Sequence, residues 1–127
     1  MSKDAAVQAQ ERGDVDRELT AIFSAYTITA TLWLLFATAI GLLLAFKFGA
    51  PDFWAAKYLT FGRLRPIHTN GTFYGWASIA LVGLAYYVAA RSCGTRLYSK
   101  RLAWVGLWLF NIAAVAGTIA LELGYNE

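Results

Sequence analysis

The sequence predicts an all-α integral membrane protein with three transmembrane helices. Of its 127 residues, 58% are hydrophobic and 15% are charged, whereas soluble domains average about 45–50% apolar and about 25% charged residues. Three runs without Asp, Glu, Lys or Arg cover residues 19–46, 66–90 and 102–121, so the other 54 residues carry all 19 charges. Each run reaches the roughly 20 residues needed to cross about 30 Å of hydrocarbon. A soluble helix would show a polar face at every turn, so an ordinary soluble fold is excluded.

The first 18 residues form a polar segment ahead of the first span. They carry three basic and five acidic side chains, which indicates a solvent-exposed, partly helical cytoplasmic tail. Span one, residues 19–46, ends where Gly49 and Pro51 follow, because glycine favours turns and proline cannot continue a helix. The predicted organisation is therefore a tail over residues 1–18 and a three-helix membrane segment over residues 19–127.

The second and third spans are joined by a short basic loop. Residues 51–65 are rich in Phe, Trp and Tyr, which are typical of the headgroup level. Pro66 is expected to open span two, since proline favours the first helical position, and this span runs to residue 90. The loop over 91–101 holds four basic residues in eleven, and span three covers about 102–121.

The distribution of Lys and Arg predicts the orientation. The tail and the 91–101 loop share one side and hold seven basic residues, whereas the 47–65 loop and the C-terminus hold four. Cytoplasmic segments carry the excess of basic residues. We therefore expect a cytoplasmic N-terminus, with the start of span two and the C-terminus on the periplasmic side or its equivalent.

Several classes of function find no support. The net charge of +3 comes from basic residues beside the spans, so it indicates topology rather than nucleic-acid binding. Cys93 has no second cysteine to pair with and is expected to be a free thiol. No nucleophile set, paired catalytic carboxylates or phosphate loop is recognisable. Asn111, in the middle of span three, should mark a face packed against other helices, whereas Trp33 is expected to be lipid-facing or interfacial.

His68 is the only histidine and lies one turn inside the predicted second span. An ionisable residue within a span indicates a functional site. At about 100° per residue, one helical face carries His68 with Gly71, Thr72, Gly75, Ile79 and Val82. The two glycines leave a groove beside the imidazole, which can admit another helix or a flat cofactor. On these residues alone, helix packing is the favoured interpretation.

Two arginines shortly before His68 favour a cofactor site over simple helix packing. Arg63 and Arg65 lie at the positive end of the helix dipole and together form an anion site. A haem combines a flat apolar ring, an iron that binds imidazole and two carboxylate tails that pair with cations. An imidazole one turn inside the membrane behind two arginines fits that shape. Membrane flanking or anchoring to lipid phosphate is the alternative role for the arginines.

The segment GRLRPIHTNGTFYGW, residues 62–76, resembles the start of the second transmembrane helix in the catalytic subunit of cbb3-type (C-family) haem–copper oxidases. The large subunit of bacterial nitric oxide reductase has a similar segment. The pair Tyr86-Tyr87, the basic loop around Cys93 and the polar Asn111 also look like that family. The resemblance covers roughly residues 20–125.

The resemblance implies a cofactor and a location. In that family the histidine at this position is one of two axial ligands of a low-spin haem b, so His68 would ligate haem b iron from the periplasmic side. Arg63 and Arg65 would lie near the haem propionates; the predicted cofactor-binding residues also include Gly71, Thr72 and Gly75. The implied location is the bacterial inner membrane. The high-spin haem and the copper of the complete enzyme need further histidines, which this chain lacks.

The implied activity is that of a cytochrome c oxidase, which reduces oxygen to water and translocates protons. The chain would be the N-terminal part of a longer polypeptide or one piece of a split catalytic subunit, inactive alone. Its expected partners are the remaining catalytic-subunit helices, c-type cytochrome subunits and the lipid bilayer. Two alternatives stay open: a segment of nitric oxide reductase, and a non-catalytic accessory subunit that braces a respiratory complex.

Overall fold

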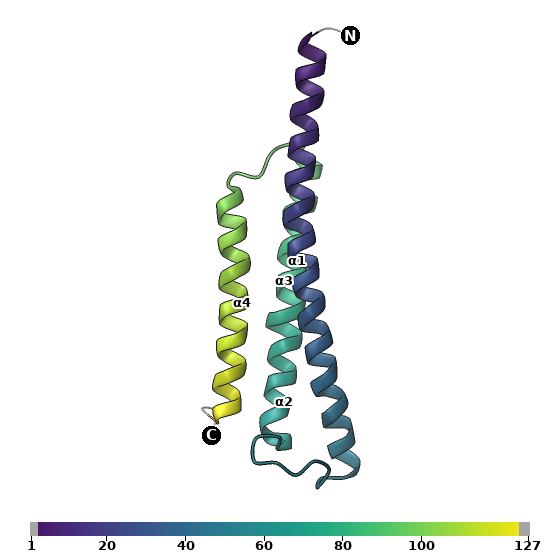
Figure 1. Cartoon of the computed structure of the whole chain (residues 1–127), viewed down its shortest axis with the longest axis vertical. Helices are drawn as coiled ribbons and strands as arrows, with labels where there is room; N and C mark the ends of the chain where they lie inside the picture. The colour runs from purple at the N-terminus through teal and green to yellow at the C-terminus, as the bar shows by residue number, and fades with distance from the viewer. Residues whose placement is uncertain (1–2, 125–127) are drawn as a thin grey trace.

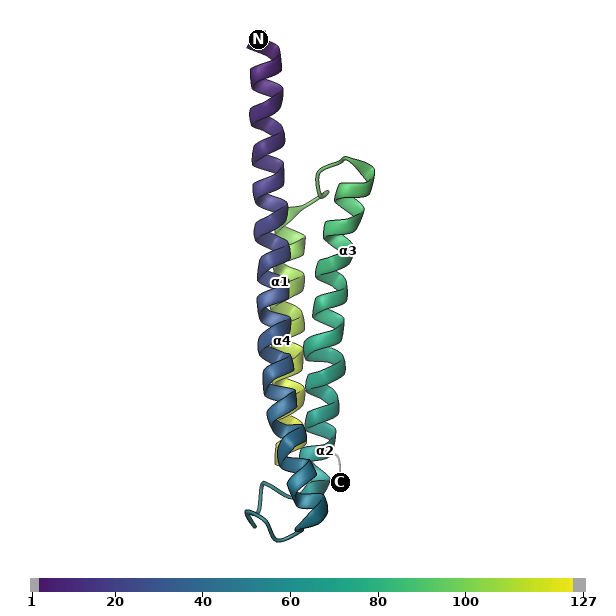
Figure 2. The ribbon, with the colours of Figure 1, turned by 90° about the vertical axis from the view of Figure 1, so that its right-hand side faces the viewer.

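Three antiparallel helical rods make up the fold (Figures 1 and 2). The computed structural model describes residues 3–124. The first rod is α1 and the third is α4, whereas the second is built of α2, the π-helix η1 and α3. The bounds are α1 Lys3–Gly49, α2 Phe61–Asn70, η1 Gly71–Ala77, α3 Ser78–Cys93 and α4 Lys100–Leu123. No strand occurs within the described residues, so the predicted all-α class is confirmed.

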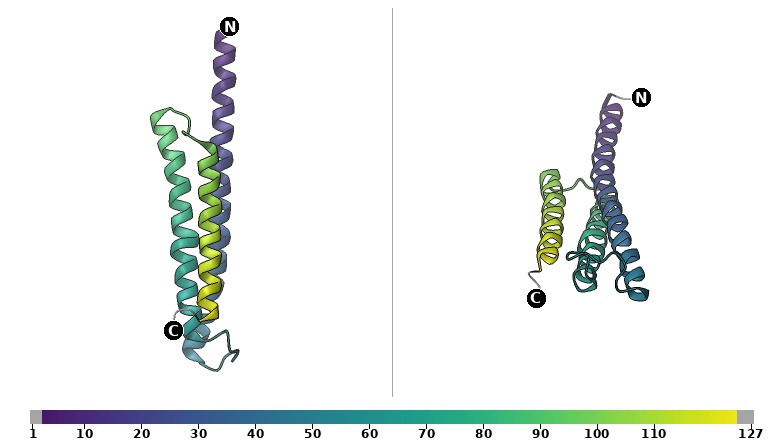
Figure 3. Two further views of the ribbon diagram at one scale, coloured as in Figure 1. Left: turned by 90° about the vertical axis from the view of Figure 1, so that its left-hand side faces the viewer. Right: turned by 60° about the horizontal axis from the view of Figure 1, so that its bottom comes forward.

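All three rods are long and apolar enough to cross a membrane. Their candidate spans have 45, 33 and 24 residues, or roughly 68, 50 and 36 Å at 1.5 Å per residue. All three lengths exceed the hydrocarbon thickness of about 30 Å. The first rod is the longest because α1 begins at Lys3 and includes the polar segment. Figure 3 shows this end of α1 extending beyond the other two rods. The described part of the tail is thus helical throughout and continuous with span one.

Span two begins earlier than the sequence predicts. α2 starts at Phe61, which places Pro66 inside the helix, so the prediction that Pro66 opens the span was wrong. The carbonyl of Thr60 accepts the N–H groups of Arg63 and Leu64 at 3.2 and 3.0 Å and starts the helix upstream. Pro66 lies within the first two turns, where its missing N–H removes one helical hydrogen bond without ending the helix.

The π-helix η1 widens the middle of the second rod. Its hydrogen bonds join residues five apart, and the hydroxyl of Ser78 donates to the carbonyl of Phe73 at 2.8 Å. Buried residues recur at a spacing of four along this stretch: Gly71, Gly75, Ile79 and Gly83. The predicted face contained the first three but continued to Val82. Val82 is half-buried and packs against the core, and Gly83 beside it is buried as well.

The three rods meet at Tyr26 of α1, which is 1% exposed. Its hydroxyl donates to the carbonyl of Ala103 in α4 at 2.7 Å, and its ring meets that of Tyr86 edge-on at 5.7 Å. Gly83 permits this approach, because a Cβ there would lie 2.5 Å from the Cβ of Tyr26. The surrounding buried cluster draws on all three rods: Ile22, Ala30, Ile79, Ala103 and Leu107.

Lys47 lies near the C-terminal end of α1 and bonds to the connection that follows. Its side chain is buried, and its ammonium donates to the carbonyls of Phe53 and Trp54 at 2.6 and 3.3 Å. A buried charge needs such partners. These bonds tie the connection over residues 50–60 back onto α1, close to the start of α2.

Candidate functional site

His68 lies near the end of α2 and is half-buried against α1. Its Nδ1 is 2.8 Å from the carbonyl oxygen of Ala37 in α1. A carbonyl oxygen only accepts hydrogen bonds, so Nδ1 is the donor. In the neutral ring, Nε2 therefore carries the lone pair. The contact with α1 fixes both the tautomer and the direction of the imidazole.

Gly41 makes room for the ring of His68. A Cβ at position 41 would lie 2.7 Å from Cε1 and 3.1 Å from Nδ1 of the imidazole, closer than real Cβ contacts. Sequence reasoning missed this residue. The available signal was a lone glycine in the apolar stretch Ile40-Gly41-Leu42 of span one, where glycine costs about 1 kcal/mol relative to alanine and indicates a packing requirement.

The second ring nitrogen of His68 is open. Among residues 3–124, Nε2 has no hydrogen-bond partner. Because no buried side-chain nitrogen or oxygen in the described part of the chain lacks a partner, the unpartnered Nε2 must be accessible. An accessible, unprotonated imidazole nitrogen whose partner nitrogen is held by a carbonyl is the donor arrangement that iron requires. No group of three or more His, Cys, Asp or Glu that could hold a metal occurs in the same part of the chain. His68 is thus the ligand candidate.

The glycine-lined groove beside His68 is filled by α1. A Cβ at Gly75 would lie 2.5 Å from Cδ2 of Trp33, and one at Gly71 would lie 3.3 Å from the Cβ of Ala37. Of the two uses predicted for this groove, the structure shows helix packing. The hydroxyl of Thr72 donates to the carbonyl of His68 at 2.8 Å, so it is engaged within its own helix.

Polar side chains link this packing to α4. The Nε1 of Trp33 donates to Oδ1 of Asn111 at 3.0 Å, and Nδ2 of Asn111 donates to the carbonyl of Leu107 at 2.8 Å. The prediction that Asn111 marks a packed face is confirmed. The prediction that Trp33 is lipid-facing or interfacial was wrong, because Gly75 opens a space for its ring.

Asn70, which the sequence interpretation left out, forms a second link to α4. Its Nδ2 donates to the carbonyl of Ala114 and to the hydroxyl of Thr118, both at 3.3 Å. Gly117 lets it approach, since a Cβ there would lie 3.3 Å from that nitrogen. The amides of Asn70 and Asn111 thus both have hydrogen-bond partners, as polar groups inside a membrane require.

The two arginines do not lie together beside the imidazole. Arg63 donates to the carbonyl of Glu122 in the last turn of α4 at 2.7 Å, and its guanidinium lies 5.8 Å from the ring centre of Tyr58. A cation at a helix C-terminus stabilises the dipole. Arg65 is exposed and lines a cavity of about 550 Å³ between α2 and the end of α4, together with Thr69. His68 faces α1 instead.

These residues all lie in the part of the chain that matches a known protein family. The family model for cytochrome c and quinol oxidase polypeptide I matches residues 21–126. The chain is 30% identical over 103 residues to a cytochrome c oxidase subunit 1 homolog of Agrobacterium tumefaciens. The aligned region covers 80% of this chain and 19% of that protein.

Two further relatives agree. A cbb3-type cytochrome c oxidase subunit of Stutzerimonas stutzeri is 29% identical over 103 residues, or 80% of this chain and 22% of the relative. Cytochrome c oxidase subunit 1 of Rhodobacter capsulatus is 27% identical over 116 residues, or 88% and 22%. The chain thus spans about a fifth of the length of these curated relatives.

Proposed function

The chain belongs to the cytochrome c and quinol oxidase polypeptide I family, and on that premise we propose that it supplies three helices and one haem ligand to a terminal oxidase. The assembled enzyme would be a cbb3-like cytochrome c oxidase of the bacterial inner membrane, reducing oxygen to water with proton translocation. The similarity to a relative named as a cbb3-type subunit supports that subtype. The multi-pass character follows from the three candidate spans.

The observation that carries this proposal is the state of the His68 ring. Nδ1 is held by Ala37 and the ring fits into the space left by Gly41, so Nε2 is the atom that would bind the iron of a low-spin haem b. Such a haem, when bound, supplies a one-electron relay centre. The chain's own part is to orient the imidazole through the Nδ1 hydrogen bond.

The arginines remain proposed as partners of the haem propionates. Arg65 is exposed, and its guanidinium makes no hydrogen bond or ion pair with residues 3–124, which supports its availability. Arg63 already bonds to the end of α4. In the proposed site it would also hold the second and third rods together.

The surface of the chain supports assembly with further helices. It exposes 8812 Å², whereas a soluble monomer of 14.0 kDa would expose about 6,700 Å². Large apolar side chains such as Leu32 and Trp108 are more than 60% exposed. Lipid and the remaining helices of the catalytic subunit are the proposed cover, and c-type cytochrome subunits are the proposed electron donors.

One observation favours a different class of function. The packing of Gly71 and Gly75 against α1 would serve equally in an accessory subunit whose helices brace a respiratory complex and whose histidine binds no haem. In that case the bond from His68 to Ala37 would be a helix-packing contact.

Replacement of His68 separates the two functions. In the complex that contains this chain, His68→Ala should abolish the absorption and electron paramagnetic resonance signals of a bis-histidine low-spin haem b, while complex assembly persists. Added imidazole should restore the signals in His68→Gly. Thr31→Val is the matched control, since Thr31 is exposed and its hydroxyl donates to the carbonyl of Thr27 in the same helix. An unchanged haem spectrum in His68→Ala would establish the bracing role instead.

A further inference from the structure

A charged cavity lies at the end of the bundle opposite His68. It has a volume of about 590 Å³ and separates the polar turns of α1 from the end of α3 and the connection to α4. Its walls include Glu11, Arg12 and Asp16 on α1 and Arg91 and Arg96 on the other side. We call it the charged crevice.

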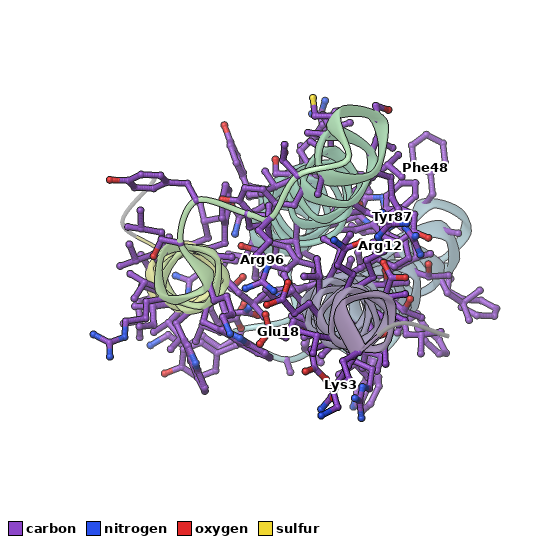
Figure 4. The ribbon with its side chains drawn as sticks, turned by 90° about the horizontal axis from the view of Figure 1, so that it is seen from above. Lys3, Arg12, Glu18, Phe48, Tyr87 and Arg96 are labelled. Atoms are coloured by element: carbon purple, nitrogen blue, oxygen red, sulfur yellow. The ribbon has the colours of Figure 1, made fainter. Side chains whose placement is uncertain are left out.

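Two of its arginines have no partner in the described part of the chain. Arg91 pairs with Asp16 at 3.1 Å and lies over the ring of Tyr87 at 5.5 Å. Arg12 and Arg96 make no ion pair or hydrogen bond with residues 3–124. Seen from above, Arg12 lies on the side of α1 toward α3 and Arg96 lies between α1 and α4, whereas Lys3 lies on the opposite side of α1 (Figure 4). The crevice thus presents two free guanidinium groups toward one space.

The lower part of the crevice is apolar. Leu19 and Ala90, which are 5% and 8% exposed, lie in its wall. A smaller cavity of about 60 Å³ shares both residues and continues to Ile22 and Leu97. Leu19 is also the first residue of the charge-free run of span one. The charged rim and apolar floor therefore lie where the chain enters the membrane.

The charge count defines the kind of ligand. Three arginines and two carboxylates line the crevice, which leaves a net charge of one positive unit. Guanidinium groups bind phosphate oxygens through paired, charge-assisted hydrogen bonds. Basic pockets between transmembrane helices at the cytoplasmic side bind lipid headgroups. A ligand with one phosphate charge and attached hydrocarbon matches both parts of the crevice.

We propose that the charged crevice binds one membrane glycerophospholipid of the phosphatidylglycerol type. Arg12 and Arg96 hold its phosphodiester, and the start of its acyl chains lies over Leu19 and Ala90. The bound lipid joins the projecting turns of α1 to the connection between α3 and α4. This site is independent of haem binding at the other end of the molecule.

Lipid retention by the chain tests the site. The 127-residue chain is incubated in detergent with phosphatidylglycerol, with the corresponding diacylglycerol or with inorganic phosphate, and bound molecules are counted by native mass spectrometry. One phosphatidylglycerol should be retained, and diacylglycerol should not. Each of Arg12→Gln and Arg96→Gln should weaken retention about fivefold. A photoactivatable phosphatidylglycerol should label peptides around residues 12–19 and 90–96.

A matched variant controls for general electrostatics. Arg17→Gln with Arg101→Gln removes the same charge from exposed positions outside the crevice, Arg17 being paired with Asp14 at 2.6 Å. This double variant should retain the lipid. Equal loss in this double variant and in the double variant Arg12→Gln with Arg96→Gln, or equal retention of diacylglycerol, would overturn the proposal. Binding of inorganic phosphate that displaces the lipid would identify a free-anion site instead. Helix content measured by circular dichroism confirms folding, and labelling elsewhere by the photoactivatable lipid would also contradict the site.

Discussion

The two ends of the bundle use polar residues in opposite ways. At the His68 end, the side chains of His68, Trp33 and Asn70 lie among apolar helices, and each of these three has a hydrogen-bond partner on a neighbouring rod. At the charged crevice, the charges are exposed and Arg12 and Arg96 have no partner within residues 3–124. Glycines make room for neighbouring side chains at the His68 end, whereas charged side chains line the crevice at the other end. Geometry should therefore dominate the effects of mutation at one end, and electrostatics at the other.

The largest effect is expected from Gly41→Ala. The new Cβ would lie 2.7 Å from Cε1 of His68, so the imidazole must move and lose its bond to Ala37. Disturbing the partner that orients a metal ligand costs about 10–100-fold in affinity. Haem b titration of the assembled complex, followed by reduced-minus-oxidised spectra, should show this loss with unchanged helix content. Gly62→Ala is the control, since its Cβ meets nothing within 4 Å; equal affinity in both variants would contradict the assignment of Gly41.

Gly75→Ala should act on stability rather than on the ligand. A Cβ there would lie 2.5 Å from Cδ2 of Trp33, and crowding of a packed interface costs about 1–3 kcal/mol. Gly62→Ala should instead be neutral or stabilising by about 0.5–1 kcal/mol, because alanine is the better helix former. Unfolding in mixed micelles measures both variants. A Gly75→Ala variant as stable as the native chain would show that the contact with Trp33 is not tight.

The smallest effect belongs to the ion pair at the rim of the crevice. The side chains of Asp16 and Arg91 are 52% and 49% exposed, and such pairs contribute about 0–1 kcal/mol. Asp16→Asn should therefore lower unfolding stability by less than 1 kcal/mol at low salt, as expected for a screened surface pair, and by still less at high salt. A loss as large as that of Gly75→Ala at both salt concentrations would contradict the contrast between the two ends.

The existence of the three spans could be predicted because long charge-free runs have few physical alternatives. Their ends could not. Charged residues can continue a helix beyond the membrane, so α1 begins at Lys3, and an upstream carbonyl at Thr60 starts α2 before Pro66. The π-helix η1 could not be predicted either, because the pattern of apolar residues does not distinguish hydrogen bonds between residues four apart from those between residues five apart.

His68 could be singled out from the sequence because it is the only histidine and lies inside a span. Its partners could not be. Ala37 contributes only a backbone carbonyl and Gly41 only the absence of a side chain, so neither has a chemical signature. Trp33 was misplaced for a related reason: its contact with Gly75 depends on the register between two rods, and the apolar pattern of span one does not specify that register.

The tautomer of His68 shows whether the fold presents Nε2 as a ligand. Because His68 is the only histidine, labelling with ¹⁵N-histidine yields two ring signals from the chain in a membrane mimic, without haem or partner subunits. For the neutral ring, we expect a protonated Nδ1 and an unprotonated, pyridine-like Nε2. In Gly41→Ala the two tautomers should become mixed. A protonated Nε2 in the native chain would contradict the claim that the fold presents this nitrogen as a ligand.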